Sequence, residues 1–188
     1  VGLRNLGADA DEGCARIGIP KDVYFQWMGM AVQIQQRNEV VNKQCVNLQA
    51  RLFTDGFTSC VLKGQGVAQL YGEQLCSLRQ SGDIDLWVNA SRDSIVKYVM
   101  DIAPTRDVNF QHVHFNVLND TTIELHIVPV SRYNPKRNWI MKKYFNSEVD
   151  RQCANRQMIG GYEMSVPTAD FQLVHQLLHV YGHYVYEG

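Results

Sequence analysis

The chain has 188 residues, a length that suits one domain built around a single core. Hydrophobic residues make up 45% of it and charged residues 20%, the balance of an ordinary globular protein. The formal net charge of -1 creates no general field that would attract a long polyanion. The composition therefore gives no reason to expect long nucleic acid as a partner, and a small molecule or a protein is the expected substrate.

Cysteine usage indicates a cytoplasmic protein. The cysteines are odd in number, widely spaced and without a CxxC pair, which is typical of reduced and mostly buried thiols. The sequence contains no secretory signal and no apolar stretch near the roughly 20 residues that span a membrane. The chain starts at Val1 and stops just after an amphipathic run, which is consistent with a fragment of a longer protein.

The N-terminal third is predicted to be a lead-in followed by a helical segment. Residues 1–20 are rich in glycine and acidic residues and end at Pro20, so we expect them to be loosely ordered. Residues 21–53 carry an apolar stripe with steps of four and three, which predicts one long helix or two, since Arg37 and Asn38 interrupt the stripe. The stripe consists of Val23, Trp27, Met30, Ile34, Val41, Cys45, Leu48 and Leu52.

Residues 58–128 are predicted to form the sheet region. A short apolar strand at 58–62 leads into a turn at 63–66 and a helical stretch at 67–71. At 83–88 apolar residues alternate with Asp83, Asp85 and Trp87, which predicts a strand with one apolar and one functional face. Ser91 is the expected N-cap of the next helix.

Two alternating segments, 108–118 and 122–128, predict a hairpin. A three-residue turn at 119–121 would place Val117 opposite Ile123 and His114 opposite His126, with apolar side chains matched across the strands. Residues 135–186 are predicted to be a helical region, with helical patterns around 139–149 and, after Pro167, from about 169 to 186. No repeat or linker divides the chain, so we expect a single α+β domain over residues 1–188, with a small mixed sheet flanked by helices.

The aspartate pair is the strongest candidate for chemistry. Side chains two residues apart on a strand project to the same face, about 7 Å apart, so Asp83 and Asp85 can share a cation. Oxygen-rich sites of this kind suit Mg²⁺ or Mn²⁺. Glu124 lies on the polar face of another predicted strand, and it would join them if the two strands are neighbours. Three carboxylates around divalent ions can activate a hydroxyl and stabilise a leaving pyrophosphate.

Two further features could bind phosphate. Lys63, Gly64 and Gln65 lie at a strand-to-helix turn, where small residues leave backbone N–H groups available to an anion. Arg79, just before the aspartate strand, offers a planar donor for a phosphate. Neither feature matches a standard phosphate-loop signature.

These motifs together resemble the uncharacterised nucleotidyltransferase family of the polymerase-beta-like superfamily. The resemblance lies in VLKGQGVAQLY at 61–71, RQSGDIDLWV at 79–88 and IELH at 123–126. It implies a metal-dependent transfer of a nucleoside monophosphate from an NTP, with ATP the expected donor, to a hydroxyl acceptor on a small molecule or a protein. It also implies that Asp83, Asp85 and Glu124 hold the metal, with Gly64 at the phosphate. The superfamily usually has serine where this chain has Gln65.

The histidines suggest alternatives. His112, His114 and His126 share the polar face with Glu124 and could line the acceptor pocket, with one as general base, or hold a zinc ion in a metal-dependent hydrolase. A third hypothesis is a catalytically inactive nucleotide-binding or protein-interaction domain, which the missing serine favours. A separate stripe on the last predicted helix is expected to flank packing. It consists of His175, His179 and His183.

Overall fold

The computed structural model describes residues 18–80, 82–131 and 134–186, so residues 1–17 of the predicted lead-in lie outside it. The helices of this part of the chain are α2 (Lys21–Thr54), α3 (Gln65–Ala68), η1 (Gln69–Tyr71), α4 (Glu73–Cys76), α5 (Arg92–Ile102), α6 (Pro135–Ala154) and α7 (Ala169–Tyr186). The strands are β1 (Thr58–Val61), β2 (Asp83–Asn89), β3 (His112–His114), β4 (Thr122–His126), β5 (Arg156–Ile159) and β6 (Tyr162–Ser165). The predicted α+β class is confirmed.

The main sheet is mixed and has four strands in the order β1-β2-β4-β3. β1 pairs with β2 in antiparallel fashion, β2 pairs with β4 in parallel, and β3 is antiparallel to β4. The parallel pair needs a long crossover, and α5 with the following loop supplies it. β2 and β4 are therefore the two inner strands, and their side chains meet in the middle of the sheet.

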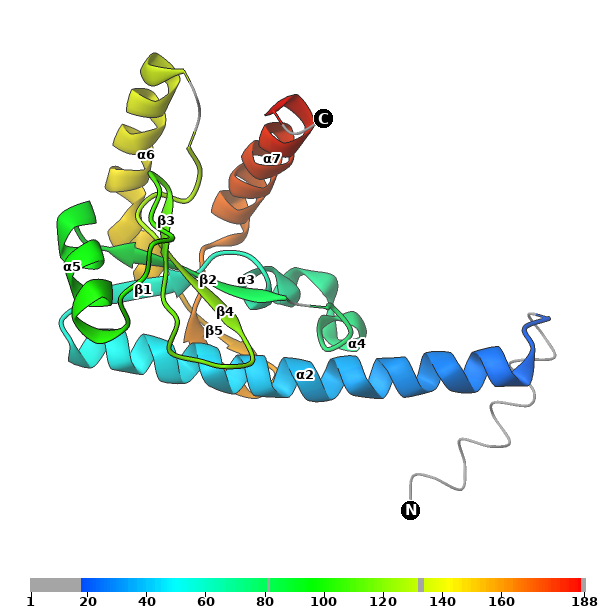
Figure 1. The fold of residues 1–188 in the computed structure, drawn as a ribbon. Coiled ribbons are helices and arrows are strands. Elements are labelled where there is room, and N and C mark those ends of the chain that lie inside the picture. The colour runs from blue at the N-terminus through cyan, green and yellow to red at the C-terminus, as the bar shows by residue number, and fades with distance from the viewer. Residues whose placement is uncertain (1–17, 81, 132–133, 187–188) are drawn as a thin grey trace.

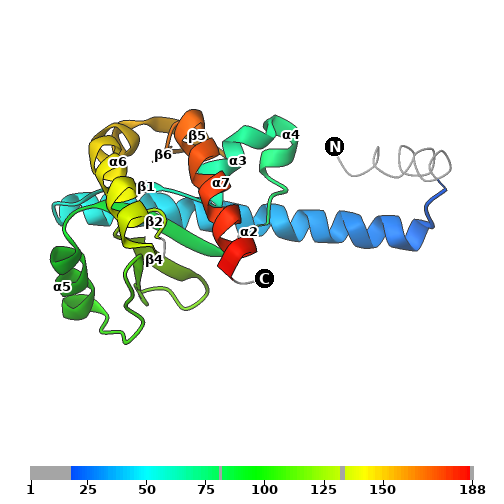
Figure 2. The same cartoon turned by 90° about the horizontal axis from the view of Figure 1, so that it is seen from above.

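Helices cover both faces of this sheet (Figures 1 and 2). On one face, α2 and α5 bury the apolar residues of the strands, including Ile84, Leu86 and Leu125. On the other face, α6 and α7 pack on one end of the sheet around Trp87, whose ring stacks on Phe171 with centroids 5.4 Å apart. The remainder of this second face carries the polar side chains.

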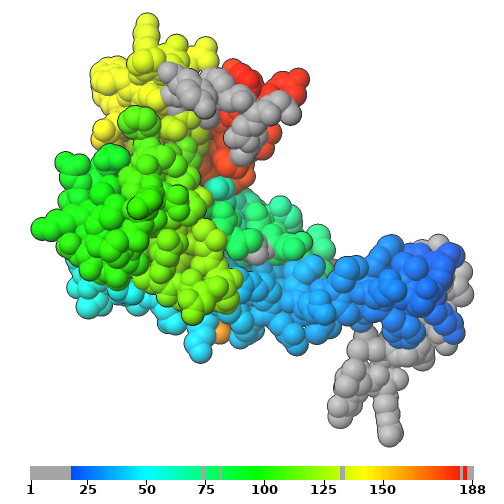
Figure 3. Space-filling view, viewed as in Figure 1, coloured from blue at the N-terminus to red at the C-terminus, as the bar shows by residue number. Residues whose placement is uncertain are grey.

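The stripe on residues 21–53 belongs to one helix of 34 residues, so the interruption at Arg37 and Asn38 does not divide it. Asn38 is buried and donates its amide to the carbonyls of Ser77 and Arg79, at 2.6 and 2.8 Å. The polar break is thus where α2 holds the segment that precedes β2. The first half of α2 projects beyond the body of the domain (Figures 1 and 3).

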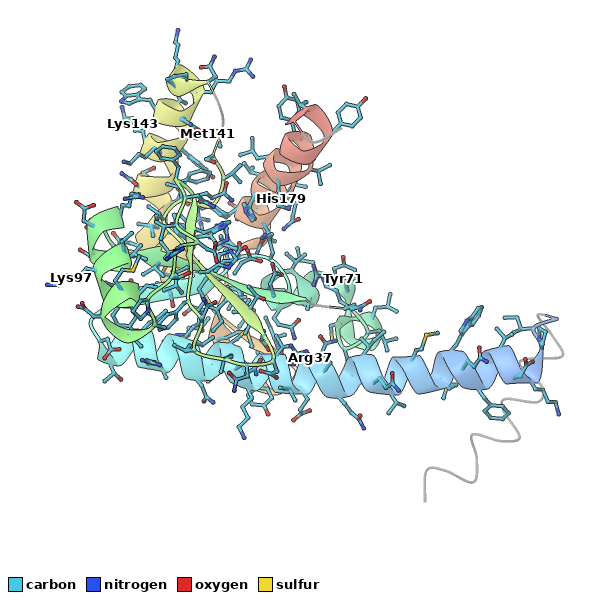
Figure 4. The ribbon with its side chains drawn as sticks, viewed as in Figure 1. Arg37, Tyr71, Lys97, Met141, Lys143 and His179 are labelled. Carbon is cyan, nitrogen blue, oxygen red and sulfur yellow. The ribbon has the colours of Figure 1, made fainter. Side chains whose placement is uncertain are left out.

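The predicted register of the β3–β4 hairpin is wrong by two residues. His114 pairs with Glu124 rather than with His126, and His112 takes the place opposite His126. The connection between the strands is longer than the predicted turn. Arg37 of α2 donates to the Asp120 carboxylate and to the Thr121 hydroxyl, at 2.9 and 2.7 Å, and so holds this connection on the helix (Figure 4). A shift of two keeps every side chain on its predicted face.

The two helical stretches expected within residues 135–186 are present as α6 and α7, but β5 and β6 form a two-stranded hairpin between them that was not expected. Gly160 and Gly161 connect the strands with φ values of 56° and 83°, the left-handed conformation that a tight hairpin turn requires. The Gly-Gly pair was the available signal.

The cysteines and the helices of the described residues bear on two expectations from composition. Cys45, Cys60, Cys76 and Cys153 are all free thiols, and three of them are buried, as predicted. None of the helices in the described part of the chain has the length and apolar character to cross a membrane.

Candidate functional site

The carboxylates lie on the polar face of the two inner strands. Asp83 and Asp85 alternate with Ile84 on β2, and the parallel pairing sets Asp85 directly opposite Glu124 on β4. Asp85 is 1% exposed, whereas Asp83 and Glu124 are only partly buried. The sheet thus brings together the three acidic residues that the sequence analysis selected, on one face.

Lys63 closes one side of the cluster. It follows β1, and its Nζ lies 2.8 Å from Oδ1 of Asp85. Burial alone would lower the pKa of Lys63, but the charge of Asp85 and its hydrogen bond raise it above the ordinary value. The ammonium therefore stays charged against the carboxylates.

His126 lies between Asp85 and Glu124. Its Nε2 is 2.8 Å from Oδ1 of Asp85 and 3.2 Å from Oε2 of Glu124, and the side chain is fully buried. Burial would lower the pKa of His126, but the hydrogen bonds to the two carboxylates raise it. Burial would likewise raise the pKa of Asp85, yet the hydrogen bond and charge of His126, with the charge of Lys63, hold it well below its usual range.

The other two strand histidines approach Glu124 from β3. Nδ1 of His112 is 3.2 Å from Oε2 of Glu124, and Nε2 of His114 is 3.5 Å from Oε1. Burial lowers the pKa of His112, although the charge of Glu124 partly opposes this effect. The pKa of Glu124 is lowered despite burial, mainly by the hydrogen bond of His126 and the charge of His112.

Charge in the cluster is not balanced. Among the described residues, the ammonium of Lys63 and a protonated His126 offset part of the charge of Asp83, Asp85 and Glu124. Burial, then the charge of Asp85, raise the pKa of Asp83, the direction expected for a carboxylate with too few positive partners. Among the described residues, Oδ2 of Asp85 is one of the few buried side-chain atoms without a hydrogen-bond partner. A buried, unpaired carboxylate oxygen beside two more carboxylates is a donor set that fits a divalent cation.

Two groups of described residues place one potential metal-ligand atom each within 4.8 Å of one another. The first consists of Asp85, Glu124 and His126, and the second consists of His112, His114 and Glu124. Glu124 belongs to both groups, whereas Asp83 lies beside them and belongs to neither.

In the turn at 63–66 the backbone passes close to the end of β1. Gly64 has φ 50° and ψ -115°, and α3 follows directly. A Cβ on Gly66 would lie 2.0 Å from the carbonyl oxygen of Val61, so only glycine fits there. Gln172 of α7 donates to the Gly66 carbonyl at 3.3 Å, which ties the turn to the last helix.

Gln65 corrects one expectation. Its side chain was expected to contact phosphate, but it is 3% exposed and donates its amide to Oδ1 of Asn42 and to the carbonyl of Asn38. Both partners belong to α2, on the far side of the turn, because a long amide at this helix start finds its acceptors in the buried polar residues of α2. Arg79 lies where expected, before β2, with its guanidinium 3.3 Å from the carbonyl of Gln80. A phosphate contact by Arg79 stays a prediction.

The histidine stripe on α7 is not uniform. His175 is fully buried, with Nε2 3.4 Å from the Pro129 carbonyl and its ring against Phe171. Burial lowers the pKa of His175 to about 3, and the charges of His126 and His179 add to the effect. His175 forms part of the buried wall behind the cluster, a more interior position than the expected one at the edge of the packing face. The available signal was its spacing of four from Phe171, which puts both on one face of the helix.

The fold and the cluster define a class: an α+β domain with acidic residues on two inner strands and a glycine turn beside them. The chain belongs to the uncharacterised nucleotidyltransferase family, whose model it matches over residues 12–188. This match confirms the resemblance that the motifs indicated. Neither the curated proteins nor the solved structures include one that is significantly similar to the chain.

Proposed function

We propose that this nucleotidyltransferase domain transfers a nucleoside monophosphate from an NTP, with ATP the first candidate, to a hydroxyl acceptor on a small molecule or a protein. The observation that carries the proposal is the parallel pairing of β2 with β4, which sets Asp85 beside Glu124 with Asp83 on the same face. Asp83, Asp85 and Glu124 would hold Mg²⁺ or Mn²⁺. When bound, such an ion neutralises the triphosphate and promotes ionisation of the acceptor hydroxyl.

The residues of the chain then have distinct tasks. In the reaction the acceptor oxygen forms a bond to the α-phosphorus, the bond between that phosphorus and the bridging oxygen breaks, and pyrophosphate leaves with the electron pair. Glu124 would orient the acceptor hydroxyl. His114 has a side chain 29% exposed, against 19% for His112 and 0% for His126, so it is our candidate to take the hydroxyl proton.

The phosphate side would be formed by Gly64 and Lys63. The backbone of the Gly64 turn would lie against the triphosphate, as small residues at a helix start allow. Lys63 would hold Asp85 in place through its 2.8 Å contact and contribute positive charge to the phosphate side. Gln65 is turned toward α2, so we assign it no contact with the nucleotide.

Pyrophosphate release measured across the four NTPs, with Mg²⁺ or Mn²⁺ and a panel of hydroxyl acceptors, tests the proposal. Asp85→Asn should lower the rate by about 100-fold or more, because it removes a charge that a bound cation needs. Asp101→Asn, an exposed aspartate on α5, is the matched control and should leave the rate unchanged. Equal rates for the parent and Asp85→Asn would refute the proposed role of the carboxylates.

A nucleotide-binding domain without turnover is the second candidate. It is favoured by Gln65, which stands at the position where the superfamily usually has serine and which faces α2. NTP binding by calorimetry, without pyrophosphate release under any of these conditions, would select it. A stoichiometric zinc ion in the purified protein, together with hydrolytic activity, would instead select a hydrolase that uses the strand histidines.

A further inference from the structure

We propose that Nε2 of His126 is a direct ligand of the divalent cation, beside Asp85 and Glu124, so that the centre is a mixed imidazole–carboxylate site. This inference rests on the proposed function, because it concerns the same ion. It changes which metals the centre takes and assigns a buried histidine to the metal rather than to the acceptor pocket.

The distances in the cluster fit this role. Nε2 of His126 lies 2.8 Å from Oδ1 of Asp85 and 3.2 Å from Oε2 of Glu124. Two donors that each bind one ion at about 2.1 Å stand about 3.0 to 3.4 Å apart in octahedral or tetrahedral geometry. Both nitrogen–oxygen separations are therefore close to those of a metal site. The ion would take the place of the Nε2 proton, which leaves as the metal binds.

The other nitrogen of the ring fixes its orientation. Nδ1 of His126 lies 3.4 Å from the carbonyl oxygen of Val128, an acceptor that only an N–H can satisfy. A ligating histidine commonly donates one ring N–H to a backbone carbonyl and presents the other nitrogen to the metal. The position of His126 on the last residue of β4, fully buried, holds this arrangement rigidly.

His112 does not compete for this role, because its contact with Asn109 fixes which ring nitrogen carries the hydrogen. Oδ1 of Asn109 accepts the backbone N–H groups of Gln111 and His112, both at 2.8 Å, so its Nδ2 must face Nε2 of His112 at 2.9 Å. That nitrogen accepts, which leaves the hydrogen on Nδ1, toward Glu124. This Nδ1–H lies 3.2 Å from Oε2 of Glu124 without forming a hydrogen bond, and in this tautomer the nitrogen offers no lone pair to a metal ion. His114 is the other histidine that could supply a nitrogen ligand, so the experiment distinguishes its contribution from that of His126.

One oxygen of the Asp85 carboxylate has no hydrogen-bond partner in the described part of the chain and remains available to the ion. Lys63 and His126 both contact Oδ1, while Oδ2 is buried and without a hydrogen-bond partner. A ligand set of one imidazole and two carboxylates suits Mn²⁺, Co²⁺ or Zn²⁺, whereas Mg²⁺ favours oxygen ligands alone. We therefore expect the metal-free protein to bind Mn²⁺ more tightly than Mg²⁺.

The test loads the full chain with Mn²⁺ without nucleotide and reads two signals. Calorimetry gives the affinity, and electron spin echo spectroscopy detects the ¹⁴N nucleus of a coordinated imidazole. His126→Asn should lower Mn²⁺ affinity by about tenfold or more and abolish the nitrogen signal. His114→Asn should retain the nitrogen signal, and His179→Asn, on α7, is the matched control with both signals unchanged.

A second measurement covers the case in which His126→Asn fails to fold. The parent protein is labelled with ¹⁵N-histidine and titrated with Zn²⁺, which should shift the resonance of one ring nitrogen. The same shift should appear in His114→Asn and in His179→Asn, so that neither residue is its source. Three results would overturn the inference: no bound divalent metal, a metal-loaded parent without a nitrogen signal, or a signal that His114→Asn removes. Absence of pyrophosphate release by a protein that shows the His126 signal would count against the proposed function alone.

Discussion

The two faces of the main sheet are built from alternate residues of the same strands, yet they solve different physical problems. The face toward α2 and α5 is mainly apolar: Ile84, Leu86 and Leu125 are at most 2% exposed, and they pack on helix side chains. The opposite face has an aromatic end around Trp87 and a polar end with Asp85. One residue along a strand thus separates a packing position from a chemical one.

The difference shows where each face derives its stability. The apolar face is stabilised by burial, which is non-directional and tolerates no loss of volume without a penalty. The polar end is held by contacts among charges, in which Lys63 and His126 offset part of the charge of three carboxylates. Its remaining negative charge favours a cation over a tightly closed, neutral network.

The comparison is sharpest at two neighbours on β4. Leu125→Ala should lower the free energy of unfolding by about 2 to 5 kcal/mol, because it opens a cavity in the core. Glu124→Gln should leave stability nearly unchanged while it lowers pyrophosphate release by about 100-fold. Chemical denaturation and the pyrophosphate assay, applied to both variants, check the pair. A large stability loss in Glu124→Gln with normal turnover would reverse the assignment of the two faces.

Gly66 should show that the turn beside the polar end is as intolerant of change as the apolar core. Gly66→Ala places a Cβ 2.0 Å from the backbone oxygen of Val61, so β1 or α3 must move, at a cost of about 3 kcal/mol. Gly29→Ala is the matched control, since a Cβ there has no atom within 4 Å and alanine favours the helix. Thermal unfolding of both variants checks this. Equal melting temperatures would mean that the turn adapts.

Much of this arrangement could be predicted because local patterns carried it. The alternation at 83–88 indicates β2 and its two faces, and Ser91 caps α5 by accepting the N–H of Ser94, as expected. The alternation of apolar side chains predicts that β3 and β4 pair with each other, but it could not fix the register of that pairing. The connection between these strands makes a contact that no local pattern indicates, since Asp120 pairs with Arg37, 83 residues away along the chain.

The site was predictable in its residue types but not in its connections. Nothing local indicates that Lys63 contacts Asp85 or that Gln65 turns to α2, because both depend on how distant elements pack. His126 was grouped with the other strand histidines. Its separate place became visible only once burial and the carbonyl of Val128 distinguished it.

His175 gives the wall behind the polar end a pH dependence that the apolar face lacks. Its pKa is lowered from an ordinary value of 6.5 to about 3 in the folded state, so protons bind the unfolded chain first as the pH falls. Stability is therefore present above about pH 6.5 and should fall by about 1.4 kcal/mol per pH unit below it. His126 has a raised pKa and is protonated in both states there, so it adds little to this slope.

His175→Phe should remove that part of the slope, because phenylalanine cannot titrate and can keep the contact with the Phe171 ring. Urea denaturation of the parent and the variant between about pH 6 and 4.5 measures the difference, before the carboxylates dominate. Parallel slopes in the two proteins would show that His175 is not the group that titrates.

Buried thiols on the two faces can report which layer opens first. Cys45 lies in the cluster under α2, where 18 buried residues pack together, and Cys60 lies in the cluster under α6 and α7, with eight. Burial raises the pKa of both thiols, to about 12 for Cys45, so reaction with a thiol reagent requires local opening. In single-cysteine variants, Cys60 should react a few-fold faster than Cys45, a difference on the order of 1 kcal/mol in opening free energy.

Because a smaller cluster is held by less buried surface, α6 and α7 should separate from the sheet before α2 does. Equal rates at both positions would mean that the two layers open together with the whole sheet, and that the faces differ in chemistry but not in cooperativity.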